Sequence, residues 1–267
     1  MRSEPKGTQV IVHRRQFLTW SGLSLLAAPR AWALGDDTRV SISLLEHGGG
    51  ESLRPSSIEQ LMWEASKRTS MDVRERPVVV DPLTETLFRS PLLVWLGEGD
   101  VPPLSESAIQ RLRRYLRGGG MLYIDDCSAI GDDAFDGRVR AEVRRLWPDR
   151  PLTALGNDHT LYRTFFLLEY PRGRLIRQKH LEGVQFDDRS PLIYGRNDLF
   201  GAFSRDELGT WTMPVVPGGQ IQREMAFRLG INLLMYATCL NYKRDQVHTT
   251  AILRRRRWRV ETPRDTR

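Results

Sequence analysis

Residues 105–127, SESAIQRLRRYLRGGGMLYIDDC, are the stretch that decides the fold. Its first half spaces apolar side chains as an amphipathic helix does, and Ser105 suits the N-cap position in front of it. Gly118-Gly119-Gly120 then stops the helix, because glycine adopts the left-handed backbone that ends helices. Met121-Leu122-Tyr123-Ile124 is a continuous apolar run, which is typical of a strand buried on both faces. The stretch therefore predicts one helix-to-strand unit of a mostly parallel α/β sheet flanked by helices.

The segments before this stretch follow the same order of elements. Residues 40–44 alternate apolar and polar side chains and predict a strand, which Gly48-Gly49-Gly50 ends. Residues 58–65 place their apolar side chains on one face of a helix. Residues 78–80 and 92–96 are short apolar runs that predict buried strands. Strand, helix, strand, strand, helix and strand is the order of an α/β domain.

The second half of the chain has weaker patterns. The elements expected there are a helix over 137–147, strands over 162–170, 183–186 and 192–194, and a last helix over about 222–240. Arg228 and Asn232 lie within the last helix and argue against a membrane span. We therefore expect this helix to cover the sheet.

The N-terminal segment has the pattern of an export signal. Residues 13–18, HRRQFL, lead into an apolar stretch, and Ala31-Trp32-Ala33 follows it. A basic region, a short apolar region and small residues at the −3 and −1 positions are the parts of a twin-arginine signal. We therefore expect the twin-arginine machinery to export the chain to the periplasm, with cleavage after Ala33. The alternative is a buried N-terminal helix that carries Arg14 and Arg15 by chance.

The formal net charge of +7 is concentrated at the two ends of the chain. Of the 40 basic and 33 acidic residues, five and one lie in 1–33, and seven and two lie in 254–267, which leaves 28 and 30 in 34–253. A nearly neutral body excludes a general nucleic-acid surface, which needs a basic face. We expect 34–253 to form a single α/β domain.

The basic end, 254–267, contains Arg254-Arg255-Arg256-Arg257 followed by Trp258. Its plainest interpretation is a disordered, solvated tail. Two alternatives remain open: an anchor to an anionic membrane surface, where clustered arginines and an interfacial tryptophan are favourable, or a docking segment for an acidic protein of the envelope.

Beyond these patterns, the chain resembles a bacterial family known as domain of unknown function 4159, from about residue 38 to 253. The pieces that carry the resemblance are Arg54-Pro55, Lys67-Arg68-Thr69-Ser70, Tyr115-Leu116-Arg117-Gly118-Gly119-Gly120, Tyr123-Ile124-Asp125-Asp126-Cys127, Trp147-Pro148-Asp149, Asp158-His159 and Gly230-Ile231-Asn232-Leu233-Leu234-Met235-Tyr236-Ala237. The resemblance implies a flavodoxin-like sheet akin to that of class I glutamine amidotransferases. It implies no known reaction.

The amidotransferase relationship raises the question of a catalytic cysteine. Those enzymes carry the cysteine between glycines, in a Gly-x-Cys-x-Gly turn, whereas Cys127 stands in Asp-Asp-Cys-Ser-Ala. Adjacent carboxylates raise the pKa of a thiol and weaken it as a nucleophile. We therefore expect the Cys-His-Glu machinery and its glutaminase activity to be absent. Cys127 and Cys239 are expected as small buried residues, and whether they pair is left open.

Candidate catalytic residues follow the best strand. Ligands of open α/β sheets bind beyond the carboxyl ends of the strands, where Asp125 and Asp126 are expected, and His159 stands in a polar loop. If these side chains converge, they could act as acid and base or hold a divalent metal. The competing interpretation is structural, because aspartates after strands commonly pin turns. We expect no metal and no cofactor.

Candidate ligand-binding residues are Arg163, Arg174, Asn197 and Asp198. A guanidinium matches a carboxylate or a phosphate, and the last two residues follow the strand expected at 192–194. The alternative is that both arginines are solvated or paired with surface acids. Two functions remain: a non-catalytic binding or assembly module of the cell envelope, and a periplasmic hydrolase that acts on a wall glycan or peptide.

Overall fold

Five parallel strands form the centre of the sheet, and two short antiparallel strands continue it at one edge. The computed structural model describes residues 39–186 and 189–255, with side chains described as far as residue 238. The strands are β1 (Ile42–Leu45), β2 (Val78–Val80), β3 (Leu92–Gly97), β4 (Met121–Asp126), β5 (Thr153–Ala154), β6 (Glu182–Val184) and β7 (Leu192–Gly195). Their order is β2-β1-β3-β4-β7-β6-β5, in which β6 pairs antiparallel with β7, and β5 pairs antiparallel with β6. The parallel part has the flavodoxin-like order, which confirms the predicted fold class.

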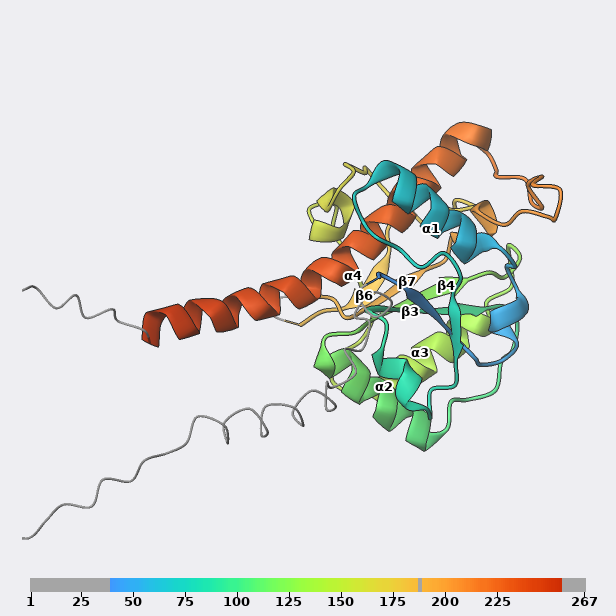
Figure 1. Cartoon of the computed structure of the whole chain (residues 1–267). Coiled ribbons are helices and arrows are strands. Elements are labelled where there is room, and N and C mark those ends of the chain that lie inside the picture. The colour runs from blue at the N-terminus through green and yellow to red at the C-terminus, as the bar shows by residue number, and fades with distance from the viewer. Residues whose placement is uncertain (1–38, 187–188, 256–267) are drawn as a thin grey trace, which may run out of the picture. The chain divides into compact units, whose positions relative to one another are not determined.

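Helices cover both faces of this sheet. They are α1 (Ser57–Arg68), α2 (Glu106–Gly118), α3 (Ala134–Leu146) and α4 (Gly219–Arg255). The first and last pack on one face, and the other two pack on the opposite face (Figure 1). Successive strand residues alternate between the two cores: Tyr123 belongs to the α1/α4 core, whereas Leu122 and Ile124 belong to the α2/α3 core. Burial on both faces explains why these strands are continuous apolar runs.

The central strands end in register, which places their following loops at one edge of the sheet. In the β3–β4 pair, Gly97 lies opposite Asp126, and in the β4–β7 pair, Asp125 lies opposite Gly195. Because all three strands are parallel, the residues after Gly97, Asp126 and Gly195 emerge together. We call this side the carboxyl edge.

The stretch 105–127 folds as predicted. The Ser105 side chain accepts a hydrogen bond from the Ala108 backbone N–H at 3.1 Å, a cap that stabilises a helix by about 1 kcal/mol. Gly119 ends α2 with a φ of 118°, in the region that favours glycine. A Cβ on Gly120 would lie 2.2 Å from the Tyr115 ring, so the chain turns into β4 only with glycine there.

The strand predicted over 162–170 is wrong. A short 3-10 helix, η3 (Thr160–Arg163), starts the segment, and residues 164–170 have no strand partner in the described structure. Tyr162, Phe166 and Leu168 pack on the same core as α4, whereas Phe165 and Leu167 are exposed. Asn232 of α4 holds its backbone: the side-chain oxygen accepts from Phe166 N–H, and the side-chain nitrogen donates to the carbonyl groups of Leu161 and Phe166, each at 2.8 Å. Asn232 therefore satisfies three backbone groups of this segment without a sheet.

The helix ends also differ from the predicted ones. The third helix begins at Ala134, three residues earlier than expected. The Asp132 side chain accepts a hydrogen bond from the Ala134 N–H at 3.0 Å and so caps this helix end. The last helix continues to Arg255 and crosses the predicted boundary at residue 253. Among the described helices, none is both long enough and apolar enough to span a bilayer. The predicted export signal and residues 256–267 of the basic end lie outside the described residues.

Candidate functional site

Charged and thiol groups meet at the carboxyl edge, where β4 and β7 end. This inner cluster consists of Arg54, Asp125, Cys127, Arg174 and Asp198. Asp198 is its centre: Arg54 donates from Nε to one carboxylate oxygen at 3.0 Å and from Nη2 to the other at 3.1 Å. Arg174 Nε and the Gly201 backbone N–H also donate to this carboxylate. A buried carboxylate is therefore neutralised by two guanidinium groups.

Asp125 fixes the turn that follows β7. Its two carboxylate oxygens accept from the backbone N–H groups of Leu199 and Phe200 at 2.9 and 2.8 Å. Burial raises the pKa of Asp125 to about 7, and the charge of Asp198 adds to the rise, whereas the backbone hydrogen bonds and Arg54 oppose it. The carboxyl group is fully enclosed. Its position is that of a turn-pinning residue.

Cys127 carries a buried thiol. Its Sγ lies 3.6 Å from the Asp125 carbonyl oxygen, and its own carbonyl oxygen accepts from Arg54 Nη2 at 2.9 Å. Burial raises the pKa of the thiol far above its usual range, and the charges of Asp198 and Asp125 raise it further. The thiol therefore keeps its proton at neutral pH, as the sequence predicted from the neighbouring carboxylates. Cys127 is unpaired, and the Cys239 side chain lies outside the described part of the chain.

One set of atoms in the inner cluster has metal-binding spacing. Ligand atoms of Asp125, Cys127 and Asp198 all lie within 4.8 Å of one another. The set does not fit a resident metal, because Arg54 already occupies both oxygens of Asp198, and a metal would have to replace this cation and the thiol proton.

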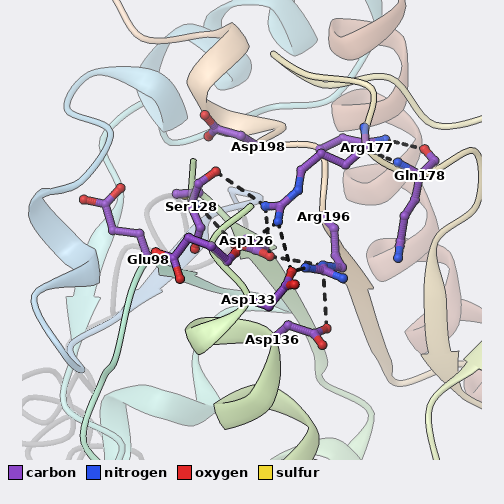
Figure 2. A network of polar contacts seen from close by, with 12 residues as sticks. Glu98, Asp126, Ser128, Asp133, Asp136, Arg177, Gln178, Arg196 and Asp198 are labelled. Atoms are coloured by element: carbon purple, nitrogen blue, oxygen red, sulfur yellow. Dashed lines mark hydrogen bonds and ion pairs between the residues drawn. The ribbon is translucent and has the colours of Figure 1, made fainter. Parts of the chain in front are cut away.

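A second group of charges lies beside Asp198 of the inner cluster (Figure 2). We call it the outer network, and its members are Asp126, Asp133, Asp136, Arg177 and Arg196. Asp126 is fully buried, and one of its oxygens accepts from Arg177 Nη1 at 3.3 Å and from Arg196 Nε at 3.2 Å. Its other oxygen accepts from the Ser128 backbone N–H at 3.0 Å. Asp126 thus fixes the inner end of both arginines.

Two further carboxylates hold the outer ends of these arginines. One oxygen of Asp133 bridges them, since it accepts from Arg196 Nη2 and lies 3.4 Å from Arg177 Nη2. Asp136, in the first turn of α3, lies 3.6 Å from Arg196 Nε and accepts from the Tyr194 hydroxyl at 3.2 Å. The side chain of Asp133 is 70% exposed, whereas those of Arg177 and Arg196 are 10% and 13% exposed.

Asn197, predicted as a ligand-binding residue, positions the loop that carries Arg177. Its side-chain oxygen accepts from the backbone N–H groups of Arg177 and Gln178 at 2.8 and 3.0 Å. Its side-chain nitrogen donates to the carbonyl oxygens of Pro171 and Gln178. All of its hydrogen-bonding groups face this protein's own backbone.

His159 does not join the carboxylates. Its Nδ1 accepts from the Leu161 backbone N–H at 3.2 Å, so Nε2 donates to the Ser190 hydroxyl oxygen at 3.1 Å. Ser190 precedes β7, whereas Asp125 lies opposite the last residue of that strand, Gly195. Five residues of a strand span about 16 Å, so His159 lies near the opposite edge. Burial lowers its pKa, and its role is to hold a loop.

The two candidate arginines, Arg174 and Arg163, also lie in different places. Arg174 joins the inner cluster through Asp198, while Arg163 is exposed at the end of η3. Sequence reasoning missed Arg177 and Arg196 as site residues. Arg196 had a usable signal, because it follows the last residue of β7 directly. Arg177 lies in an irregular loop, and nothing in the local sequence marks it.

The chain contains one His-x-Glu sequence, His180-Leu181-Glu182. The carboxylate of Glu182 is held by Arg140 of α3, at 3.3 Å from Nη1 and 2.8 Å from Nη2. Cys127 packs in the core on the α1/α4 face, on the other side of the sheet from α3. The cysteine and this glutamate therefore do not form a catalytic set.

The chain was compared with known proteins. No match was found among curated proteins. A family model described as Domain of unknown function (DUF4159) matches residues 41–238, which include every strand, α1 to α3, and both charge clusters. Because the match covers most of the chain and agrees with the resemblance seen in the sequence, the protein belongs to the DUF4159 family of domains of unknown function.

Proposed function

We propose that this protein is an exported, non-catalytic binding or assembly module of the bacterial cell envelope. The observation that carries the proposal is the state of the carboxyl edge. Asp126 and Asp198 are buried and bound by arginines, and Asp125 is bound by backbone N–H groups. Cys127 keeps its proton. Acid–base and nucleophilic catalysis need a reactive group that can reach a substrate, and these groups are already engaged.

The loops at the usual ligand crevice support the same conclusion. In flavodoxin-like sheets this crevice lies where the strand order reverses, between β1 and β3. There, His47 Nε2 lies 2.8 Å from the Pro102 carbonyl oxygen, and a Cβ on Gly48 would lie 2.9 Å from the Cβ of Val101. The two loops touch each other across the crevice. A small substrate would have to part them, whereas a partner protein can bind over them.

Export is part of the proposal and rests on the sequence. The pair Arg14-Arg15, the short apolar stretch and Ala31-Trp32-Ala33 support transport by the twin-arginine machinery to the periplasm. That route suits a protein whose buried ion pairs form before transport. The basic end, with Arg254-Arg255-Arg256-Arg257, supports contact with an anionic membrane surface or an acidic envelope protein.

A periplasmic hydrolase acting on a wall glycan or peptide is the second candidate. One observation favours it: the pKa of Asp125, about 7, suits a group that transfers protons at neutral pH. The position of His159 weighs against the acid–base set predicted from sequence, because its ring bonds Ser190 at the other edge. Asp125 is also fully enclosed. The module is therefore the better supported function.

A digestion experiment separates the two. Purified protein is incubated with isolated peptidoglycan, and soluble fragments are analysed by mass spectrometry. We expect no release above that of heated protein. In parallel, the chromosomal gene is replaced by a gene that encodes Asp125→Asn or Cys127→Ser. Each variant is expected to support the same envelope properties as the wild type, in contrast to a deletion of the gene.

The opposite results would establish the hydrolase. Fragment release that disappears in Asp125→Asn, with an unchanged melting temperature, shows turnover that depends on this carboxyl group. The matched control is Asp81→Asn, because Asp81 is an exposed loop carboxylate that accepts from the Leu83 N–H outside both clusters.

A further inference from the structure

We propose that Arg177 and Arg196 form a binding site for a carboxylate group of a partner peptide, and that Asp133 occupies this site in the free protein. The inference rests on the proposed function, because it names the chemistry by which the carboxyl edge recognises a partner. It uses the outer network and none of the residues of the inner cluster.

The carboxylate of Asp133 shows which group the site accepts. One of its oxygens accepts hydrogen bonds from both guanidinium groups, from Nη2 of Arg177 and from Nη2 of Arg196. The Asp133 side chain is 70% exposed. An external carboxylate can therefore approach from solvent and take the same position.

The two arginines are held in place independently of Asp133. Asp126, which is fully buried, accepts from Nη1 of Arg177 and from Nε of Arg196. Arg177 also donates from Nη2 to the Asp132 carbonyl oxygen at 3.1 Å, and Asn197 fixes its backbone. Both guanidinium groups would keep their orientation when Asp133 moves away. Preorganised binding groups lose little entropy on binding.

Asp133 is not required for the helix that it precedes. It is the N-cap residue of α3, but its side chain makes no capping hydrogen bond, and Asp132 accepts from the Ala134 N–H instead. The N-terminus of α3 also favours an anion nearby. Asp133 can therefore turn away without leaving the helix uncapped.

One carboxylate can take the place of another at the two guanidinium groups. The positive charges of Arg177 and Arg196 are opposed by buried Asp126 and by Asp136, whose side chain is 15% exposed. Asp133 adds a third carboxylate at the surface. A ligand carboxylate that replaces it leaves the charge facing the two guanidinium groups unchanged, while the displaced Asp133 keeps its own charge in solvent. Affinity is therefore set by competition with Asp133 and weakens with salt.

The test removes the internal competitor. Asp133→Asn keeps the size of the side chain and abolishes its charge at an exposed position, so the fold should be retained. Three peptides serve as probes: N-acetyl-triglutamate amide, N-acetyl-triglycine with a free C-terminus, and N-acetyl-triglutamine amide. Binding to the full chain is measured by calorimetry at low ionic strength, with inorganic phosphate as a fourth probe.

We expect at least one carboxylate peptide to bind Asp133→Asn about tenfold more tightly than it binds the wild type, because the competing side chain is gone. The triglutamine peptide should bind neither. Preference for triglutamate identifies side-chain carboxylates as the ligand, and preference for triglycine identifies a peptide C-terminus. Adding Arg196→Lys should abolish the gain, since lysine keeps a charge opposite Asp126 but lacks the fork. Arg76→Gln, which changes an exposed arginine before β2, should leave the gain unchanged.

Equal affinities of the wild type and Asp133→Asn for both carboxylate peptides would overturn the inference, as would a gain for phosphate alone or an equal loss in Arg76→Gln. These results would leave the proposed module intact, because a module can bind its partner through another surface. Peptidoglycan turnover would instead contradict the proposed non-catalytic function. The peptide affinities would still decide whether Arg177 and Arg196 bind a carboxylate.

Discussion

Arg54 and Asp198 form a two-pronged ion pair inside the protein, with Nε and Nη2 donating to the two carboxylate oxygens at 3.0 and 3.1 Å. Arg54 lies just before α1, and Asp198 follows β7, so the pair joins segments 144 residues apart in sequence. Asp198 has a φ of 49°, a left-handed conformation that aspartate tolerates better than most residues. The pair therefore fixes the loop that leads from β7 to the 3-10 helix beginning at Phe200.

Asp198→Asn should be strongly destabilising. The amide leaves the guanidinium groups of Arg54 and Arg174 in a buried site without their carboxylate, and breaking a buried pair in this way costs about 3–5 kcal/mol. Urea unfolding followed by circular dichroism measures the loss. Asp133→Asn is the matched control, because its exposed ion pair should contribute less than about 1 kcal/mol. Equal losses in the two variants would contradict the central role of Asp198.

Asp125 should make stability depend on pH. Burial raises its pKa to about 7 in the folded protein, whereas an unfolded aspartate titrates near pH 4. Between these values the folded protein holds a proton that the unfolded chain has released. Its contribution to stability is therefore complete below about pH 4 and is lost as the pH rises through about 7.

Asp125→Asn removes this titration. The variant also loses an acceptor for Leu199 or Phe200 N–H, which lowers stability by an amount that does not change with pH. The difference in unfolding free energy between wild type and variant should therefore shrink as the pH rises from 4 to 7. Unfolding curves at three pH values in this window test it, and a difference that stays constant would contradict the raised pKa.

Cys127 should be unreactive in the folded protein. Its thiol is buried and protonated, so a disulfide reagent reaches it only when the protein opens. A Cys239→Ser variant makes Cys127 the only thiol in the chain. We expect its labelling to be on the order of a thousandfold slower than that of free cysteine, and to become fast in guanidinium chloride. Rapid labelling of the native variant would show an accessible nucleophile.

Much of the fold could be predicted because burial and backbone chemistry act locally. The apolar runs of β3 and β4, the Ser105 cap and the glycine stop after α2 are each readable within a few residues. The segment 164–170 could not be predicted, because its backbone is satisfied by Asn232, more than sixty residues later. Apolar content alone does not distinguish a strand from a loop packed under a helix.

The candidate site was also predictable only where local sequence determines it. The sequence indicates Asp125, Asp126 and Asp198 because the first two end β4 and the third follows β7, where the topology of the sheet gathers loops. Their neutralisation was not predictable, since it depends on Arg54 and Arg177, which come from loops distant in sequence. The sequence does not reveal at which edge of the sheet a loop lies, so it cannot separate His159 from the carboxylates.

Export should depend on the arginine pair at the start of the chain. Replacing Arg14 and Arg15 by lysine preserves the charge of the basic region but removes the feature that the twin-arginine machinery recognises. We expect the protein to move from the periplasmic to the cytoplasmic fraction, with residues 1–33 still attached by mass spectrometry. Lys6→Arg, a change in the same basic region, is the control. An unchanged distribution would show that another route delivers the protein.

The basic end should contribute to membrane contact without contributing to the fold. Deleting residues 256–267 removes five arginines, Trp258 and two acids, a net charge of +3. Each cation near an anionic surface is worth about 1 kcal/mol, so the loss should lower co-sedimentation with phosphatidylglycerol vesicles by roughly a hundredfold in partition coefficient. Melting should not change, because the described core ends well before residue 256. Vesicles of neutral lipid are the control, and equal sedimentation of both forms with the anionic vesicles would dismiss the anchor.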